Sequence, residues 1–215
     1  MNQSDLRQQV ADTARLSVEH GLNQGSSGNV SVRCGAGMLI TPSGLATDAL
    51  GPNDIVYLPF DGEAEGDLPP SSEWRFHRDI YLNRSEANAV VHAHSPFAVS
   101  LSCLRRGIPP FHYMVALAGG KDIHCAEYAT FGTQALSDHI LQALTDRYAC
   151  LMANHGLVAF GETAERALYI ALEVEALCEQ FWRASLLGQP VLLSDAEMAE
   201  VIERFKSYGK RRARS

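Results

Sequence analysis

Three short apolar segments, from two distant parts of the sequence, constrain the fold more than any other feature. Residues 89–94 read AVVHAH, and the apolar stretches 150–153 and 157–160 flank a bend at Asn154-His155-Gly156. Short apolar runs bounded by turn residues are typical of strands that are buried on both faces. We therefore predict a mixed sheet that holds these segments in its interior and is covered by helices.

Five other segments combine helical spacing of apolar residues with capping or breaking residues, which predicts helices. We expect them over residues 4–20, 73–81, 95–104, 133–144 and 163–187, with Ser4 capping the first and Ser71 or Ser72 the second. Period-two alternation and turn residues predict a hairpin over residues 30–41 and a third strand over residues 55–60. Residues 62–67 should form a surface loop.

Composition limits the classes to which the chain can belong. Its 215 residues, 46% apolar and 20% charged, fit one globular domain, and 18 basic against 25 acidic residues give a net charge of -7. The only basic cluster is at residues 206–214, so no nucleic-acid-binding face is expected. Five spaced cysteines without a Cys-x-x-Cys pair should be reduced. Without a signal pattern or an apolar run of ~20 residues, a cytoplasmic protein with no membrane contact is predicted.

Three histidines carry the most specific chemistry. His92 and His94 alternate along one predicted strand, so their side chains leave the same face and can bind one metal ion together. His155 lies at a tight bend between strands, where the backbone can direct a side chain into a cleft. Taken alone, the His92/His94 pair is as often structural as metal-binding. A histidine in a turn, taken alone, is more often structural. Together, the three predict a catalytic metal site with open coordination positions.

Three imidazoles suit Zn²⁺, with Mn²⁺ or Co²⁺ as alternatives. An ion held in this way would polarise a ketose carbonyl and stabilise the enediolate left when a neighbouring carbon–carbon bond breaks. A Schiff-base lysine is disfavoured, because the only lysines are Lys121, Lys206 and Lys210, and Lys121 follows two glycines in an expected loop. A cupin-type site is also disfavoured, since the next glutamate after the histidine pair is Glu127, far downstream.

Two further features have an ordinary structural explanation. Glu73 is a candidate base for proton transfer, but an acid in the first turn of a helix, where it complements the helix dipole, explains it better from the sequence alone. Residues 25–29, 41–44 and 71–72 are rich in Gly, Ser and Asn, and their backbone N–H groups and hydroxyls could bind a phosphate. Each segment by itself is more simply a turn or a cap.

Several motifs resemble one known family. The longest are SGNVSVR at 27–33, LITPSG at 39–44, PSSEWRFH at 70–77, VVHAH at 90–94 and NHGL at 154–157. Shorter ones are HYM at 112–114, YATFGT at 128–133 and FKSYG at 205–209. In order, and almost without gaps from about Gly25 to Tyr208, they resemble the class II aldolase/adducin family, and within it the enzymes that act on L-fuculose 1-phosphate.

The resemblance implies a fold and an assembly. The fold is α/β: a single class II aldolase domain over residues 1–215, built as an α/β/α sandwich with a central, largely antiparallel mixed sheet. Residues 206–215 are expected to form a basic, mobile tail. The assembly is a homotetramer with active sites at the subunit interfaces.

The resemblance also implies roles for individual residues. His92, His94 and His155 match the metal ligands, and Glu73 matches the residue that ligates the resting ion and acts as acid and base during turnover. Tyr113 would reach in from an adjacent subunit and donate a proton to the aldehyde oxygen. The phosphate-binding positions correspond to Asn29, Ser43, Gly44, Ser71 and Ser72, and the aldehyde-side pocket to Phe131 and Tyr208.

The expected reaction is the reversible cleavage of a deoxy-ketose 1-phosphate, similar to L-fuculose 1-phosphate, into dihydroxyacetone phosphate and L-lactaldehyde or acetaldehyde. Such a lyase would belong to carbohydrate metabolism. Two alternatives are an epimerase resembling that of L-ribulose 5-phosphate and a non-enzymatic assembly domain like that of adducin. The epimerase pattern has an Asp-Thr-type sequence after the serine pair where this chain has Glu73-Trp74, and the complete ligand set disfavours the assembly role.

Overall fold

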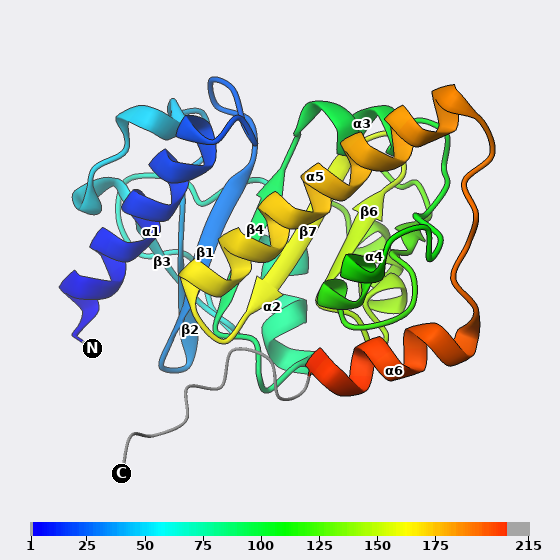
Figure 1. Ribbon diagram of the computed structural model, residues 1–215. Helices are drawn as coiled ribbons and strands as arrows, with labels where there is room; N and C mark the ends of the chain where they lie inside the picture. The colour runs from blue at the N-terminus through cyan, green and yellow to red at the C-terminus, as the bar shows by residue number, and fades with distance from the viewer. Residues whose placement is uncertain (1, 206–215) are drawn as a thin grey trace, which may run out of the picture.

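The computed structural model describes residues 2–205, in which a seven-stranded sheet forms the middle layer (Figure 1). Its strands lie in the order β3-β2-β1-β4-β7-β6-β5, and all neighbours are antiparallel except β5 and β6. They are β1 (Asn29–Cys34), β2 (Gly37–Ile40), β3 (Val56–Pro59), β4 (Ala89–Ala93), β5 (Cys125–Ala126), β6 (Ala149–Met152) and β7 (Gly156–Gly161). The sheet is mixed and largely antiparallel, as predicted.

Helices cover both faces of the sheet, which confirms the expected α/β/α sandwich. One face carries α1 (Gln3–Glu19), α3 (Pro96–Ser102) and α5 (Ala164–Leu187), and the other carries α2 (Trp74–Asn83) and α4 (Gln134–Ala143) (Figure 1). Two 3₁₀ turns, η1 (Thr47–Ala49) and η2 (Pro52–Asp54), lie between β2 and β3. On the α5 side, α6 (Asp195–Phe205) packs against the 3₁₀ helix η3 (Tyr113–Ala118).

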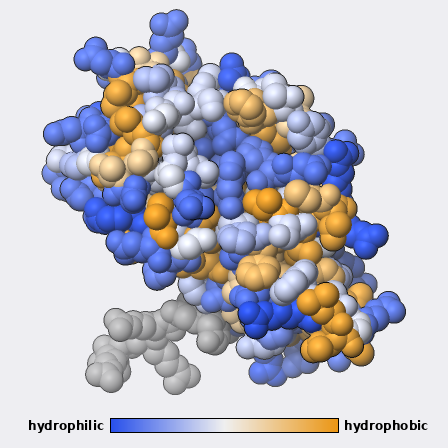
Figure 2. Space-filling model, turned by 90° about the horizontal axis from the view of Figure 1, so that it is seen from above, coloured by the Kyte–Doolittle hydropathy of each residue, from blue (hydrophilic) through white to orange (hydrophobic). Residues whose placement is uncertain are grey.

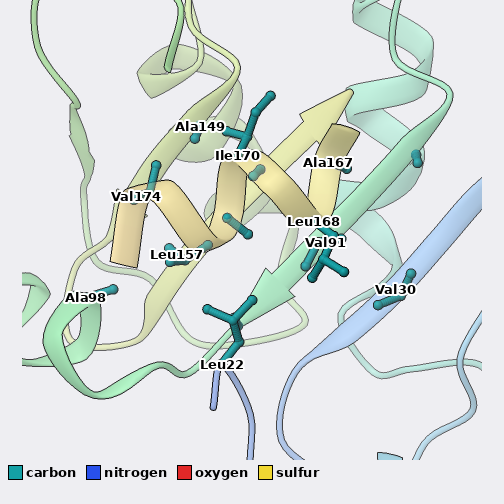
Figure 3. Close-up of a cluster of buried hydrophobic side chains, with 14 of the residues drawn as sticks. Leu22, Val30, Val91, Ala98, Ala149, Leu157, Ala167, Leu168, Ile170 and Val174 are labelled. Atoms are coloured by element: carbon teal, nitrogen blue, oxygen red, sulfur yellow. The ribbon is translucent and has the colours of Figure 1, made fainter. Parts of the chain in front are cut away.

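Alternation along the strands divides the hydrophobic core into two clusters. In β4, Val91 joins the cluster beneath α5, whereas Val90 joins the cluster beneath α2 and α4. Figure 3 shows the first cluster, to which Val91 of β4, Leu157 of β7 and Ile170 of α5 contribute. Burial of each such side chain contributes roughly 1.5–3 kcal/mol. Because β4 and β7 are buried along their whole length, solvent reaches functional side chains only where these strands end.

A buried carboxylate joins α2 to α4. Asp79 accepts hydrogen bonds from Gln134 Nε2 (2.6 Å) and Ser137 Oγ (2.7 Å) of α4, and from Arg78 Nε (2.8 Å). Burial raises the pKa of Asp79, but these three donors outweigh it and hold the pKa below its usual value of 3.8. The charged form of this side chain therefore stabilises the fold.

The predicted helices and strands are confirmed to within two residues at their ends, but two cap assignments are wrong. Ser4 lies inside the first turn of α1, and Asn2 is the residue whose side chain caps it. Glu73 occupies the cap position of α2, and no side chain caps that helix. Ser71 instead accepts a hydrogen bond from the Glu73 N–H (3.3 Å), and both Ser71 and Ser72 line a cavity.

Five elements were not predicted: the short turns η1 and η2, and β5, η3 and α6. The two-residue β5 is too short to show a strand period, and η3 is a 3₁₀ helix without helical periodicity in its sequence. In α6, the apolar residues Met198, Val201, Ile202 and Phe205 do follow helical spacing, and this signal could have located the helix. The predicted tail at residues 206–215 lies outside the described residues. None of the helices within residues 2–205 is both long and apolar enough to cross a bilayer.

Candidate metal centre and active site

Three histidines from two separate chain segments meet at one end of the sheet. His92 is in β4, His94 follows that strand, and His155 lies in the turn between β6 and β7. The ring centroids of each pair are 4.8 Å apart. They converge because β4 and β7 are antiparallel neighbours, so one strand ends where the other begins. Asn154 has a left-handed φ of 55°, which Asn tolerates better than most residues and which orients the turn.

A carboxylate completes the cluster from the α2 side. Glu73 Oε2 lies 3.1 Å from His92 Nε2, and Glu73 Oε1 lies 3.2 Å from His155 Nε2. Asn29 in β1 pairs with His92 in the sheet, and its Nδ2 donates to Glu73 Oε2 over 3.0 Å. One potential ligand atom from Glu73 and each histidine lies within 4.8 Å of all the others. Four ligand groups of this kind match the donor set of a divalent metal site.

Two observations fit a cation at this position. His92 Nδ1–H donates to the Leu157 carbonyl (2.7 Å), which leaves the lone pair on Nε2 directed at the cluster, 2.9 Å from His94 Nε2. Glu73 Oε1 is buried and has no hydrogen-bond partner among the described residues. An orphaned carboxylate oxygen beside imidazole lone pairs is costly without a positive charge between them. The residues therefore fit a bound metal ion.

The electrostatics of the cluster point the same way. Burial raises the pKa of Glu73, but the neighbouring His92 and His155 outweigh it and hold the pKa well below its ordinary value. Burial and the adjacent His92 lower the pKa of His94 to about 4 and that of His155 to about 3. Burial also opposes protonation of His92, yet the Glu73 carboxylate beside it raises its pKa overall. Two imidazoles are thus neutral at pH 7, as metal ligation requires.

Hydrogen bonds outside the cluster fix the position of His94. Its backbone N–H donates to Asn23 Oδ1 over 3.0 Å. On the other side, Glu175 of α5 accepts from the N–H groups of Phe97 and Ala98, both over 2.8 Å, in the first turn of α3. A carboxylate at a helix N-terminus complements its dipole. The segment that follows His94 is therefore tied to the longest helix of the fold.

A cavity of about 400 Å³ opens beside the cluster, a size suited to a small ligand. Glu73, His94 and His155 line one side of it. The rest is lined by residues 26–29, 42–44 and 71–72, and by Tyr128, Ala129, Phe131 and Asn154. Figure 2 looks onto this end of the molecule, where hydrophilic residues occupy the middle of the surface. A larger hollow of about 940 Å³ between α3, α4 and α5 is lined by none of the four cluster residues. The candidate site is therefore identified by its ligand residues and not by the volume of its cavity.

The structure brings most of the predicted site residues to this cavity. His92 lies beneath it with no exposed surface, and the lining includes Asn29, Ser43, Gly44, Ser71, Ser72 and Phe131. Tyr113 is in η3, half-exposed and not among the lining residues, so its role across a subunit interface stays a prediction. Tyr208 lies outside the described residues.

Sequence reasoning missed three residues around the site. Tyr128 lines the cavity and lies within the YATFGT motif, so the motif offered a signal for it. Asn23 and Glu175 have no local signal, because their partners are remote in the sequence and only packing brings them together.

The sandwich fold and the His-His-His-Glu cluster define a class of protein, and comparison with known proteins gives the same class. The family model described as Class II Aldolase and Adducin N-terminal domain matches residues 8–182. The chain therefore belongs to the class II aldolase and adducin family and is a class II aldolase, a carbon–carbon lyase.

Relatives and a solved structure cover nearly the whole chain. A 5-methylthioribulose-1-phosphate/5-deoxyribulose-1-phosphate aldolase of Rhodospirillum rubrum is 53% identical, over 95% of this chain and 92% of the relative. The L-fuculose phosphate aldolase of Escherichia coli (strain K12) is 47% identical, over 98% of this chain and 99% of the relative. A solved L-fuculose 1-phosphate aldolase superposes with a TM-score of 0.91 at 40% identity, covering 96% of this chain and 98% of that one.

Proposed function

We propose that the protein is a metal-dependent aldolase that reversibly cleaves a deoxy-ketose 1-phosphate into dihydroxyacetone phosphate and a short aldehyde. The observation that carries this proposal is the convergence of His92, His94, His155 and Glu73 beside a cavity sized for a sugar phosphate. We further propose that residues 1–215 form one domain and that the enzyme is cytoplasmic.

His92, His94, His155 and Glu73 would hold the metal ion, with Zn²⁺ the best match to the donor set and Mn²⁺ or Co²⁺ as alternatives. When bound, the ion supplies Lewis acidity, which polarises the ketose carbonyl and stabilises the negative charge that develops there. The protein's contribution is to fix the geometry of the four ligands, since β4 and the β6–β7 turn hold the imidazoles rigidly.

Glu73 is the proposed acid and base. Its side chain contacts His92 and His155 and also lines the cavity, and it is almost fully buried, with 7% of its surface exposed. A carboxylate in this position can take a proton from a substrate hydroxyl or deliver one at carbon with little competition from water. The hydrogen bond from Asn29 Nδ2 holds one of its oxygens while the other faces His155.

The phosphate is proposed to bind at the end of the cavity formed by Asn29, Ser43, Gly44, Ser71 and Ser72. No lysine or arginine is among the described residues that line the cavity. The phosphate charge would instead be met by hydroxyls, backbone N–H groups and the N-terminus of α2, which begins directly after Ser72-Glu73. This arrangement favours a small phosphate ester over a larger polyanion.

The aldehyde end is proposed to lie toward Phe131, completed in a homotetramer by Tyr113 of an adjacent subunit and by Tyr208. Phe131 lines the cavity yet is 64% exposed in the single chain, as expected for a side chain covered on assembly. Tyr113 is likewise exposed and would donate a proton to the aldehyde oxygen. The size and polarity of the substrate beyond the cleaved bond would be selected here.

A substrate panel tests the proposal. Enzyme reconstituted with Zn²⁺ is incubated with L-fuculose 1-phosphate, 5-deoxyribulose 1-phosphate and 5-methylthioribulose 1-phosphate, the substrates named for its relatives, and dihydroxyacetone phosphate is assayed. We expect triose formation with at least one of them, and the aldehyde product identifies the preferred substrate: L-lactaldehyde for the first and acetaldehyde for the second.

Two results would reject the proposal. One is conversion of L-ribulose 5-phosphate to its epimer without any triose from the panel. The other is the absence of a stoichiometric divalent ion in protein purified without chelators. A substitution at the proposed acid and base, Glu73→Gln, should lower turnover. Glu127→Gln, which changes an exposed loop glutamate, is the matched control and should keep wild-type turnover.

A further inference from the structure

A line of buried hydrogen bonds runs from Glu73 into the core between β1 and α2. Asn29 Nδ2 lies 3.0 Å from Glu73 Oε2, and Asn29 Oδ1 lies 2.5 Å from His77 Nε2. Ser31 Oγ is 2.7 Å from His77 Nδ1 and 2.7 Å from the Tyr81 hydroxyl. Asn29 and Ser31 are two residues apart on one face of β1, and His77 and Tyr81 are one helical turn apart on α2.

Only one direction of donation satisfies every member of this line. An ionised carboxylate only accepts, so the Asn29 amide presents its N–H to Glu73 and its Oδ1 to His77. The Oδ1 atom requires a donor, so His77 carries its proton on Nε2. The lone pair on His77 Nδ1 then accepts from the Ser31 hydroxyl, and Ser31 accepts in turn from Tyr81. The tautomer of one histidine thus fixes the orientation of one amide.

Burial makes this arrangement hard to replace. His77 and Ser31 have no exposed surface, Tyr81 has 2% and Asn29 has 5%, so water cannot readily substitute for a missing partner. Burial also lowers the pKa of His77 to about 3, which keeps the ring neutral with a single N–H. A flipped Asn29 amide would turn its Oδ1 toward the Glu73 carboxylate, and the two oxygens would repel each other.

We propose that His77 is a positioning residue for the reaction: its Nε2–H locks the Asn29 amide so that Nδ2 holds Glu73 Oε2 in place. His77 is absent from the described lining of the cavity and acts only through Asn29. The inference rests on the proposed function in so far as Glu73 is the metal ligand and proton-transfer group. Its structural part, the tautomer and the amide orientation, is independent of any activity.

Two substitutions of His77 test the roles of its two ring nitrogens separately. The side-chain amide of Gln extends as far as Nε2 of His, so His77→Gln can still donate to Asn29. That of Asn reaches only as far as Nδ1, so His77→Asn keeps a partner for Ser31 and removes the donor to Asn29. Relative to wild type, we expect kcat to fall about 10- to 100-fold in His77→Asn and to stay within about threefold in His77→Gln.

Zinc affinity and the tautomer give readouts that do not depend on turnover. By chelator competition, zinc binding should weaken about 10-fold in His77→Asn and stay within about threefold in His77→Gln. In the metal-free protein, ¹⁵N NMR of the imidazole should show His77 protonated on Nε2. Ser31→Ala, which keeps the core volume nearly unchanged, should also weaken zinc binding. It takes the place of His77→Asn and His77→Gln as the test if those two variants fail to fold.

The proposal is overturned if His77 carries its proton on Nδ1, or if His77→Asn and His77→Gln show equal zinc affinities and equal turnover. If only Ser31→Ala folds, a wild-type zinc affinity in that variant also overturns the proposal. Failure of the proposed function has a different signature: wild-type enzyme then cleaves none of the ketose 1-phosphates, while the tautomer and the zinc affinities still decide the role of His77.

Discussion

Gly156 is the residue whose replacement by alanine should disturb the proposed metal centre most directly. It follows His155, begins β7 and pairs with Met152 across the turn. A Cβ atom at Gly156 would lie 2.2 Å from the Ala93 carbonyl oxygen and 3.3 Å from His94 Cδ2. Ala93 separates His92 from His94, so the clash falls between two of the segments that carry the proposed metal ligands.

The displacement can be worked out from these distances. Ordinary van der Waals contact begins at 3.4 Å, so Gly156→Ala must gain at least 1.2 Å between the start of β7 and the end of β4. Overpacking of a well-packed interior costs about 1–3 kcal/mol. For a chain of this length that corresponds to a fall in Tm of roughly 2–12 °C. A misplacement of about 1 Å at a catalytic site can lower turnover about 100-fold.

Zinc affinity, turnover and thermal unfolding of the metal-free protein are measured together on Gly156→Ala. We expect zinc binding to weaken about 10- to 100-fold, since the ligands can no longer converge without strain. Gly51→Ala is the matched control, because a Cβ there would meet only Asp54 Oδ2 at 3.6 Å. Wild-type zinc affinity and turnover in a folded Gly156→Ala protein would refute the reasoning, since they would mean that β4 and β7 separate without moving the ligands.

Further substitutions test other parts of the argument. His94→Ala removes one ligand nitrogen, so zinc content and turnover should be lost together, and metal analysis beside kcat checks this. Glu73→Gln keeps the size of the side chain, so kcat should fall about 10²- to 10⁴-fold while zinc occupancy falls less; wild-type turnover contradicts the assigned role. Asp79→Asn should cost about 1–3 kcal/mol at pH 7 in denaturant unfolding, whereas the exposed Asp138→Asn should cost less than about 0.5 kcal/mol. Because the folded pKa of Asp79 lies below 3.8, its contribution is present above that pH and is lost on acidification through the folded pKa, so the deficit of Asp79→Asn should shrink there.

Local sequence patterns were sufficient for the elements that carry the proposed metal ligands. The alternation in residues 89–94 placed His92 and His94 on one face of a strand, and the bend at Asn154 placed His155 between two strands. These are short-range properties, because side-chain direction along a strand depends only on the backbone period. The same reasoning failed at the caps of α1 and α2, where hydrogen-bond geometry decides between neighbouring residues.

Only the tertiary structure decided the character of Glu73 and its surroundings. The local pattern alone made it an ordinary helix-start acid, and only the family motif implied a catalytic role. In the fold its Oε1 is a buried oxygen without a hydrogen-bond partner among the described residues, 3.2 Å from His155. The register of β1 against β4 brings Asn29 to Glu73. The packing of α2 against β1 brings His77 to Asn29. Register and packing depend on segments that are remote in the sequence, and no local pattern encodes them.

The sequence by itself therefore determined which residue types lie at the ends of which strands, and the motifs that mark the family. The fold determined that three imidazoles and one carboxylate share a single point beside a cavity, with a buried line of hydrogen bonds behind them. The physical reason is the difference in range: strand period and turn preference act over a few residues, whereas convergence of ligands is a property of how strands align and helices pack.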